Sequence, residues 1–323
     1  MSTFAYTMMC EQSRPDRLVR DVCLAERAGF DFSMISDHYQ PWLRAQGHAG
    51  YAWSISARPQ ATERIGLMTF VTCPTIRYHP AIVAQKAATM QILSGNRFRL
   101  GLGAGENLNE HVLGGGWPMV GARHEMLSEA VDVIAALFDA SQEDTVSHRG
   151  RHFDLESARL WDRPEVRVPI GIAVSGPESC ALAGRKGDLM IAVAPDAQLG
   201  ERFDAAGGAG KPRVGQVALA YATDRDAAIR RAHEQLRWFG LGWRVNADLP
   251  DPESFEAASA SVGAEEVADA IACGPDLDEH VAKIRSFVDA GFTEIALVQI
   301  GEETEEAFTA WAQRELLAAL RAL

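Results

Sequence analysis

The segments FSMISDHYQPW, residues 32–42, and FRLGLGAGENLNE, residues 98–110, decide how this chain is expected to fold. Each begins with a short apolar run that is typical of a buried strand, and each continues directly into ionisable or glycine-rich residues. In an α/β barrel the carboxyl ends of the strands form the rim of the active site. We therefore expect the ionisable side chains of both segments to lie at such a rim.

Outward from these two segments, short apolar runs alternate with helical patterns along the whole chain. Strands are expected at residues 4–8, 32–35, 65–71, 97–102, 168–174, 189–193, 214–222 and 294–300. Helices are expected at residues 16–28, 81–93, 123–138, 177–185, 227–239, 277–290 and 305–320. About eight strands with helices between them predict a (β/α)₈ TIM barrel.

The barrel is expected to be one domain that spans residues 1–323, with two additions. Residues 146–155 predict a β-hairpin, and residues around 240–275 fit no pattern and are expected to form an insertion. A doubly wound open sheet is the main alternative. It requires a G-x-G-x-x-G turn after the first strand, and Met8-Met9-Cys10-Glu11 supplies none.

The composition excludes several classes of partner. A formal net charge of −13 argues against nucleic acid and anionic membranes. The chain has no run of eighteen apolar residues and no signal-peptide pattern at its start, so we expect a cytoplasmic protein without a membrane span. The five cysteines have no spacing typical of zinc, so we expect reduced thiols and no metal.

Three residues at predicted strand ends are candidates for catalysis. His38 can act as a base, and the neighbouring carboxylate of Asp37 can orient it; a structural histidine in a loop turn is the alternative. Trp42 offers a rigid apolar wall with one N–H donor, although a lone tryptophan is more often a core residue. Glu11 is either a second acid near the histidine or a solvated residue at the barrel mouth.

Two glycine-containing turns are candidates for cofactor binding. Gly103 and Gly105 let the backbone approach a ligand closely, so that Glu106 and Asn109 can bond to its edge, although many strand-to-helix turns look like this. Ser175-Gly176-Pro177 leads into a predicted helix, whose N-terminus is a natural seat for a phosphate. An acidic residue, Glu178, is an awkward neighbour for that phosphate.

These motifs together resemble the luciferase-like monooxygenase superfamily, and within it the branch related to F420-dependent glucose-6-phosphate dehydrogenase. The resemblance runs from residue 4 to the last predicted helix. Its specific parts are Ser36–Trp42, Cys73–Pro80, Gly105–Glu110, Ser175–Pro177 and Cys273–Asp276.

The resemblance implies coenzyme F420, a 5-deazaflavin whose C5 accepts or donates hydride. It implies that His38 removes the proton of a substrate hydroxyl and that Asp37 contacts the cofactor ring and orients the site. By the same resemblance, Trp42 packs at the reacting centre, Glu106 supports the charge change of the ring, and Glu11 is an acid near the substrate.

Other residues take cofactor-binding roles from the same resemblance. Gly105 and Asn109 line the ring site, and the turn of Ser175, Gly176 and Pro177 lies near the cofactor tail. The family often has a non-prolyl cis peptide bond, which falls here at Phe70-Val71 and would form a bulge behind the ring. Members of the superfamily commonly form homodimers, so we expect one here.

The substrate half departs from the pattern of sugar-phosphate dehydrogenases, which hold the substrate phosphate with basic side chains. The corresponding stretches here contain Asp196, Phe255 and Ala268-Asp269-Ala270, none of which supplies a cation. A neutral alcohol, ketone or enone is therefore expected as the small-molecule substrate in place of glucose 6-phosphate.

Two alternative functions stay open at this point. One keeps the fold but binds FMN and acts as a monooxygenase or reductase; Asp37-His38 together with Trp42 favours the deazaflavin. The other is a non-catalytic cofactor-binding protein. The pair of His38 and Glu106 argues against it, because a carrier needs no base.

Overall fold

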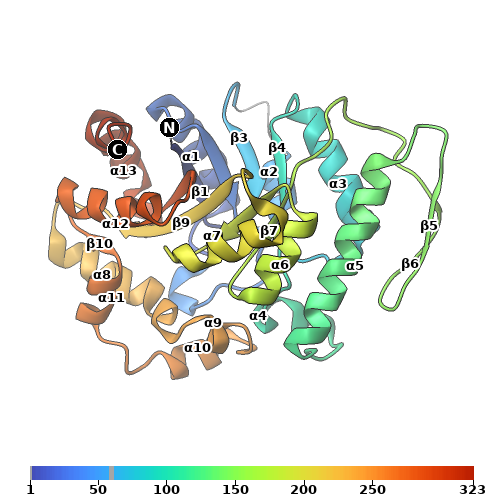
Figure 1. Cartoon of the computed structure of the whole chain (residues 1–323). Coiled ribbons are helices and arrows are strands. Elements are labelled where there is room, and N and C mark those ends of the chain that lie inside the picture. The colour runs from blue at the N-terminus through green and yellow to red at the C-terminus, as the bar shows by residue number, and fades with distance from the viewer. Residues whose placement is uncertain (1, 58–61) are drawn as a thin grey trace.

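Eight parallel strands close into a barrel within residues 2–57 and 62–323, the part of the chain that the computed structural model describes (Figure 1). They are β1 (Thr3–Met8), β2 (Phe32–Ile35), β3 (Gly66–Thr69), β4 (Phe98–Leu102), β7 (Ile170–Ala173), β8 (Leu189–Ala192), β9 (Arg213–Ala220) and β11 (Glu294–Gln299). The ring closes because β9 pairs with both β8 and β11, and β11 pairs with β1. The prediction of a (β/α)₈ barrel is confirmed.

The interior of the barrel is filled by side chains of alternating strand residues, which we call the inner cluster. Its buried members are Ala5, Phe32, Met34, Met68, Leu189, Ile191, Val214 and Ala296. The opposite faces of the same strands pack under the surrounding helices in a second, larger apolar cluster. Because both faces of each strand are buried, the strands read as nearly continuous apolar runs.

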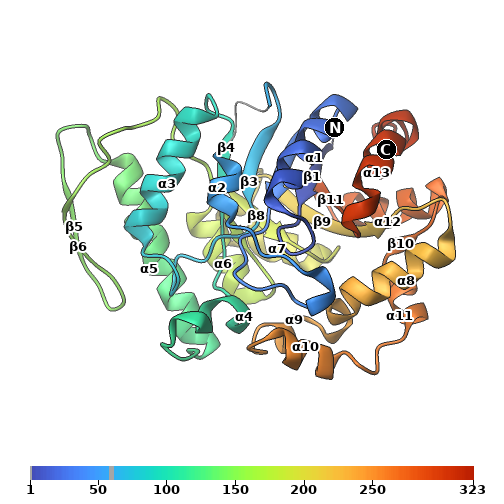
Figure 2. The same cartoon turned by 180° about the vertical axis from the view of Figure 1, so that it is seen from behind.

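Helices surround this barrel on its outside (Figures 1 and 2). They include α1 (Pro15–Ala28), α2 (Ala52–Ser56), α3 (Pro80–Leu93), α5 (Val120–Asp139), α6 (Pro177–Lys186), α7 (Ala197–Phe203), α8 (Arg225–Leu236), α12 (Leu277–Asp289) and α13 (Glu305–Trp311). The chain continues after α13 through η7 (Ala312–Leu316) into α14 (Leu317–Leu320). Further short turns are η1 (Arg44–Gln46), η4 (Asp204–Gly208) and η6 (Glu302–Thr304).

A second group of short elements gathers at the end of the barrel where the strands terminate (Figures 1 and 2). They are α4 (Asn107–Glu110), η3 (His111–Leu113), η5 (Arg237–Leu241), α9 (Trp243–Asn246), α10 (Pro252–Ala258), α11 (Ala264–Ala270) and β10 (Ala272–Cys273). The two-residue strand β10 pairs with β9 and was not expected. That residues 240–275 are an insertion in a single domain stays a prediction.

Three further expectations can be compared with the structure. The hairpin is confirmed as β5 (Val146–Arg149) and β6 (Asp154–Ala158), which project from the barrel in Figure 1. The Phe70–Val71 peptide bond is cis, as the resemblance implied. Helix α5 begins three residues earlier than expected, because Val120–Ala122 are helical before the apolar periodicity starts. In the described part of the chain, no helix combines the length and apolar character that crossing a membrane requires.

We expect Gly101→Ala to lower the free energy of unfolding by about 3 kcal/mol or more. An added Cβ would lie 2.0 Å from the carbonyl oxygen of Thr69 in the neighbouring strand, and the closed barrel leaves no direction in which to relax. Urea denaturation measures the loss. The matched control is Gly121→Ala in the first turn of α5, where no atom lies within 4 Å of the added Cβ. Alanine there is expected to be neutral or slightly stabilising, and equal midpoints for both variants would contradict the prediction.

Candidate active site

Two carboxylates flank one imidazole at the carboxyl ends of the strands. Nδ1 of His38 lies 3.0 Å from Oε1 of Glu11, and Nε2 of His38 lies 3.6 Å from Oε1 of Glu106. Glu11 follows β1, His38 follows β2, and Glu106 follows β4, so the barrel register brings together residues that are up to 95 positions apart. Glu11 is 1% exposed and Glu106 is 7% exposed. The structure therefore places three of the predicted catalytic residues in one buried cluster.

The neighbours of His38 decide which ring nitrogen carries the proton when the ring is neutral. Nδ1 faces both the Glu11 carboxylate and the carbonyl oxygen of Gln40, which lies 3.3 Å away. A carbonyl oxygen only accepts hydrogen bonds, so we assign the proton to Nδ1. Nε2 is then the nitrogen with a free lone pair, and it points to the side of Glu106 without a hydrogen bond to it.

Asn109 holds Glu106 in place. Its Oδ1 accepts hydrogen bonds from the backbone N–H groups of Tyr39 at 2.7 Å and Gln40 at 3.0 Å, so its Nδ2 is turned to Glu106 and donates to Oε1. Asn109 is fully buried and ties the Glu106 loop to the loop that carries His38. Its predicted contact with a cofactor ring stays a prediction.

The carboxylate of Asp37 does not bond to His38, although the two residues are adjacent in the sequence. Its carboxylate accepts hydrogen bonds from Thr72 at 2.7 Å, from the Trp53 indole at 3.1 Å and from the Tyr78 hydroxyl at 3.1 Å. In this structure Glu11, and not Asp37, contacts the imidazole. A contact between Asp37 and a cofactor ring stays a prediction.

A buried ion pair lies under the catalytic cluster. The backbone N–H of Arg77 donates to Oε2 of Glu110 at 2.8 Å and its Nε donates to Oε1 at 3.1 Å, while Nη2 donates to the carbonyl oxygen of Asp37 at 2.6 Å. Burial raises the pKa of Glu110 to about 7, although the Arg77 guanidinium opposes that rise. The sequence patterns had assigned no role to Arg77 or Glu110, although both lie inside quoted motifs.

Trp42 forms an aromatic wall beside His38, with ring centroids 5.0 Å apart. It stacks on Trp238 with centroids 4.0 Å apart and planes 10° from parallel, and it meets the edge of Phe255 at 5.1 Å. Trp238 belongs to η5 and Phe255 to α10, so this wall is completed by the segment between β9 and β10. Sequence patterns gave no signal for Trp238, and Phe255 had been noted only because it is not a cation.

An apolar surface lies at the strand ends. Phe70, Val71 and Ala173 are partly exposed and pack on the inner cluster. Gly103 is required beside them, because a Cβ there would lie 2.6 Å from Cγ2 of Val71. Gly105 has a φ of +88°, which favours glycine, and it leads directly into Glu106.

In the turn that was expected to seat a phosphate, two backbone N–H groups already have a hydrogen-bond partner within the protein. The N–H groups of Ser175 and Gly176 donate to Oγ of Ser179 at 3.0 and 3.2 Å, and Pro177 begins α6. Oε2 of Glu178 lies 3.0 Å from Nδ1 of His124. The carboxylate is therefore directed to His124 and not to the turn. A cofactor tail at this turn stays a prediction.

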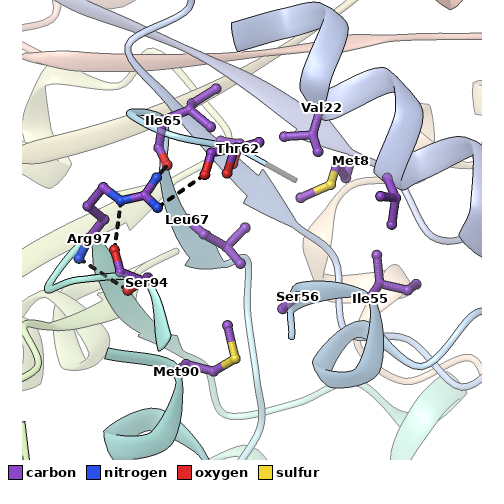
Figure 3. A pocket seen from close by; sticks show the side chains of 12 residues that line it. Met8, Val22, Ile55, Ser56, Thr62, Ile65, Leu67, Met90, Ser94 and Arg97 are labelled. Carbon is purple, nitrogen blue, oxygen red and sulfur yellow. Dashed lines mark hydrogen bonds between the residues drawn. The ribbon is translucent and has the colours of Figure 1, made fainter. Parts of the chain in front are cut away.

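Metal-binding groups and hollows elsewhere in the described residues do not compete with this cluster. Among residues 2–57 and 62–323, no three histidine, cysteine, aspartate or glutamate side chains form a group that fits a metal ion. Figure 3 shows a separate hollow between α1, α2 and β3, lined by apolar side chains such as Val22, Ile55 and Leu67. The described residues that line this hollow do not include Glu11, His38, Glu106 or Trp42.

Comparison with known proteins gives consistent matches along the chain. A model of the luciferase-like monooxygenase family matches residues 2–294. The F420-dependent glucose-6-phosphate dehydrogenase of Microbacterium testaceum is 33% identical, over 98% of this chain and 97% of that protein. The F420-dependent hydroxymycolic acid dehydrogenase of Mycobacterium tuberculosis is 38% identical, over 87% of this chain and 78% of that protein.

Among solved structures, an F420-dependent secondary alcohol dehydrogenase in complex with an F420-acetone adduct superposes with a TM-score of 0.90. It is 27% identical in sequence, and the match covers 99% of each chain.

The ion pair beneath the site predicts a pH dependence of stability. The pKa of Glu110 is about 7 in the folded protein against 4.5 for an ordinary glutamate, so the folded state binds this proton more tightly. Its contribution to the free energy of unfolding is fully present below pH 4.5 and is lost as the pH rises through about 7. Relative to Glu110→Gln, which cannot titrate, we expect the wild type to lose up to about 3 kcal/mol over this range. Urea denaturation at several pH values measures the difference, and a difference that does not change with pH would contradict it.

Proposed function

The chain belongs to the luciferase-like monooxygenase family, and from that premise we propose that it is an F420-dependent oxidoreductase. It transfers hydride between C5 of the deazaflavin and an alcohol, ketone or enone. The observation that carries this proposal is the position of the His38 imidazole, held at the barrel mouth between the buried carboxylates of Glu11 and Glu106.

The residues at the strand ends fit a planar cofactor. The partly exposed side chains of Phe70, Val71 and Ala173 form an apolar surface, and the glycine at position 103 keeps the neighbouring backbone close to Val71. Glu106 lies next to this turn and supplies a charge near the edge of a ring. When bound here, F420 would supply the carbon that accepts or donates hydride.

His38 then performs the proton transfer that accompanies oxidation of an alcohol. Nε2 takes the hydroxyl proton, and the resulting imidazolium lies between Glu11 at 3.0 Å and Glu106 at 3.6 Å. Both carboxylates thus face the positive charge that the ring gains when it accepts the proton. In the reduction of a ketone the same nitrogen returns the proton. The wall of Trp42 packs against the apolar part of the substrate and limits the access of water.

The charges at the mouth support a neutral substrate. Asp196 caps the N-terminus of α7, Phe255 is fully buried against Trp42, and Ala268 is 8% exposed, so none of these three positions offers a cation. A phosphate dianion held there would lose its water without gaining a counter-charge, which is strongly unfavourable in a desolvated site. We therefore propose an unphosphorylated substrate, although several relatives are named for glucose 6-phosphate.

Replacing His38 by alanine should reduce alcohol-dependent reduction of F420 by about 10²–10⁴-fold, the usual range for a lost general base. The Kd for F420 should change little, because the apolar surface and the Glu106 loop remain. Stopped-flow absorbance measures hydride transfer, and cofactor titration measures binding. His148→Ala, in the projecting hairpin, is the matched control and should behave as wild type. Near-normal alcohol turnover by His38→Ala would refute the role of base.

The charge argument predicts the outcome of a substrate panel. With F420 as acceptor, kcat/KM for a neutral secondary alcohol should exceed that for glucose 6-phosphate by at least about a hundredfold, because the positions of Asp196, Phe255 and Ala268 offer the dianion no cation. Steady-state rates at matched ionic strength measure the ratio. Faster turnover of the sugar phosphate would show that the proposed substrate class is wrong while leaving the cofactor assignment intact.

A further inference from the structure

The hydroxyl of Ser36 links two backbone segments immediately behind the imidazole. Its Oγ accepts a hydrogen bond from the N–H of Cys10 at 2.9 Å and donates to Oε2 of Glu11 at 2.5 Å. Ser36 is 8% exposed and Glu11 is 1% exposed, so water does not compete freely for these bonds. Because an N–H group can only donate, Cys10 occupies a lone pair of Oγ, and the hydroxyl proton is directed to Glu11.

This bond fixes the orientation of the Glu11 carboxylate. One oxygen of Glu11 is held by Ser36, and the other faces Nδ1 of His38 at 3.0 Å. The terminal torsion of a glutamate side chain is otherwise broad, so a buried carboxylate without this donor has no reason to keep that plane. Losing the donor also leaves one buried oxygen without a partner, which is costly enough to make the carboxylate rotate.

We propose that Ser36 is a positioning residue that sets the tautomer of His38 through Glu11 and so keeps Nε2 free to take the substrate proton. The inference rests on the proposed function of His38 as a base. Ser36 itself touches neither the imidazole nor the reacting atoms; it acts on them through one carboxylate.

Asp37, the acid adjacent in sequence, is not placed to take over this task, and Glu106 faces the other ring nitrogen. The oxygens of Asp37 already accept bonds from Thr72, Trp53 and Tyr78. The carbonyl oxygen of Gln40, at 3.3 Å from Nδ1, would still favour the same tautomer, but as a neutral and longer contact it does so less strongly. The loss on removing Ser36 is therefore expected to be smaller than the loss on removing His38.

The first arm of the test reads the tautomer without any cofactor or substrate. ¹⁵N NMR of the cofactor-free protein, at a pH where the ring is neutral, distinguishes a protonated from an unprotonated ring nitrogen. The His38 signals are assigned among the nine histidines by their absence in His38→Gln. We expect protonated Nδ1 in the wild type and in Ser36→Thr, and a mixture of tautomers in Ser36→Ala.

The matched control is Ser33→Ala in β2, the strand that directly precedes Ser36. Ser33 is 1% exposed and its hydroxyl also makes one buried hydrogen bond, to the carbonyl oxygen of Gly66 at 2.8 Å, but that bond does not reach the site. Its removal should leave the His38 tautomer and kcat unchanged. A shifted tautomer or a comparable loss of kcat in Ser33→Ala would show that any buried hydroxyl of β2 has this effect, and would overturn the assignment.

The second arm measures turnover by the full chain with F420 and a secondary alcohol. We expect Ser36→Ala to lower kcat by about ten- to a hundredfold with little change in KM, since a misplaced base loses rate and not ground-state binding. Ser36→Thr, which keeps the hydroxyl, should restore most of that rate. Wild-type tautomer and wild-type kcat in Ser36→Ala would overturn the proposal, as would unprotonated Nδ1 in the wild type.

The two arms separate this inference from the function on which it rests. If the wild type oxidises no alcohol with F420, the proposed function fails and the NMR arm alone decides the tautomer. If the wild type is active and Ser36→Ala equals it, only the role of Ser36 fails. Should Ser36→Ala not fold, Ser36→Cys replaces it in the test. Its thiol is only a weak donor, so this variant should show the mixed tautomer. A wild-type tautomer in Ser36→Cys would overturn the proposal.

Discussion

One buried cation, Arg77, holds together the loops that follow β2, β3 and β4, two of which carry residues of the site. It donates to Glu110 after β4 and to the backbone of Asp37 after β2, and it follows β3 itself. Removing one partner of a buried pair typically costs about 3–5 kcal/mol, because the other charge is left uncompensated. Since two acids share this one guanidinium, the relative positions of His38 and the Glu106 loop depend on it.

Next to this ion pair, the site places two carboxylates around one imidazole. Glu11 and Glu106 approach His38 from opposite nitrogens, and each is held by a hydrogen bond from a residue that does no chemistry, Ser36 or Asn109. In the function proposed above, both carboxylates face the charge that the imidazole gains when it takes a proton.

The barrel was predictable from the sequence because its strands are buried on both faces and leave uninterrupted apolar runs, and because strand ends gather at one rim. That rule also placed His38, Glu11 and Glu106 correctly as neighbours. It does not give side-chain direction, so it paired His38 with the adjacent Asp37, which in fact bonds Trp53, Thr72 and Tyr78. Trp238 and the strand β10 lie beside or in a segment without periodicity. Trp238 stacks on Trp42, 196 positions away, and β10 pairs with β9, 53 positions away, and contacts over such separations leave no local pattern.

The stacking of Trp42 on Trp238 and Phe255 has a consequence for how such an enzyme diversifies. The groups proposed to move the proton directly follow the barrel strands, whereas two of the three aromatic rings come from helices between β9 and β10. Exchanges in those helices alter the shape offered to a substrate without disturbing the acids behind the imidazole. Substitutions in this one peripheral segment can therefore change which substrates fit, while the residues around the imidazole stay the same.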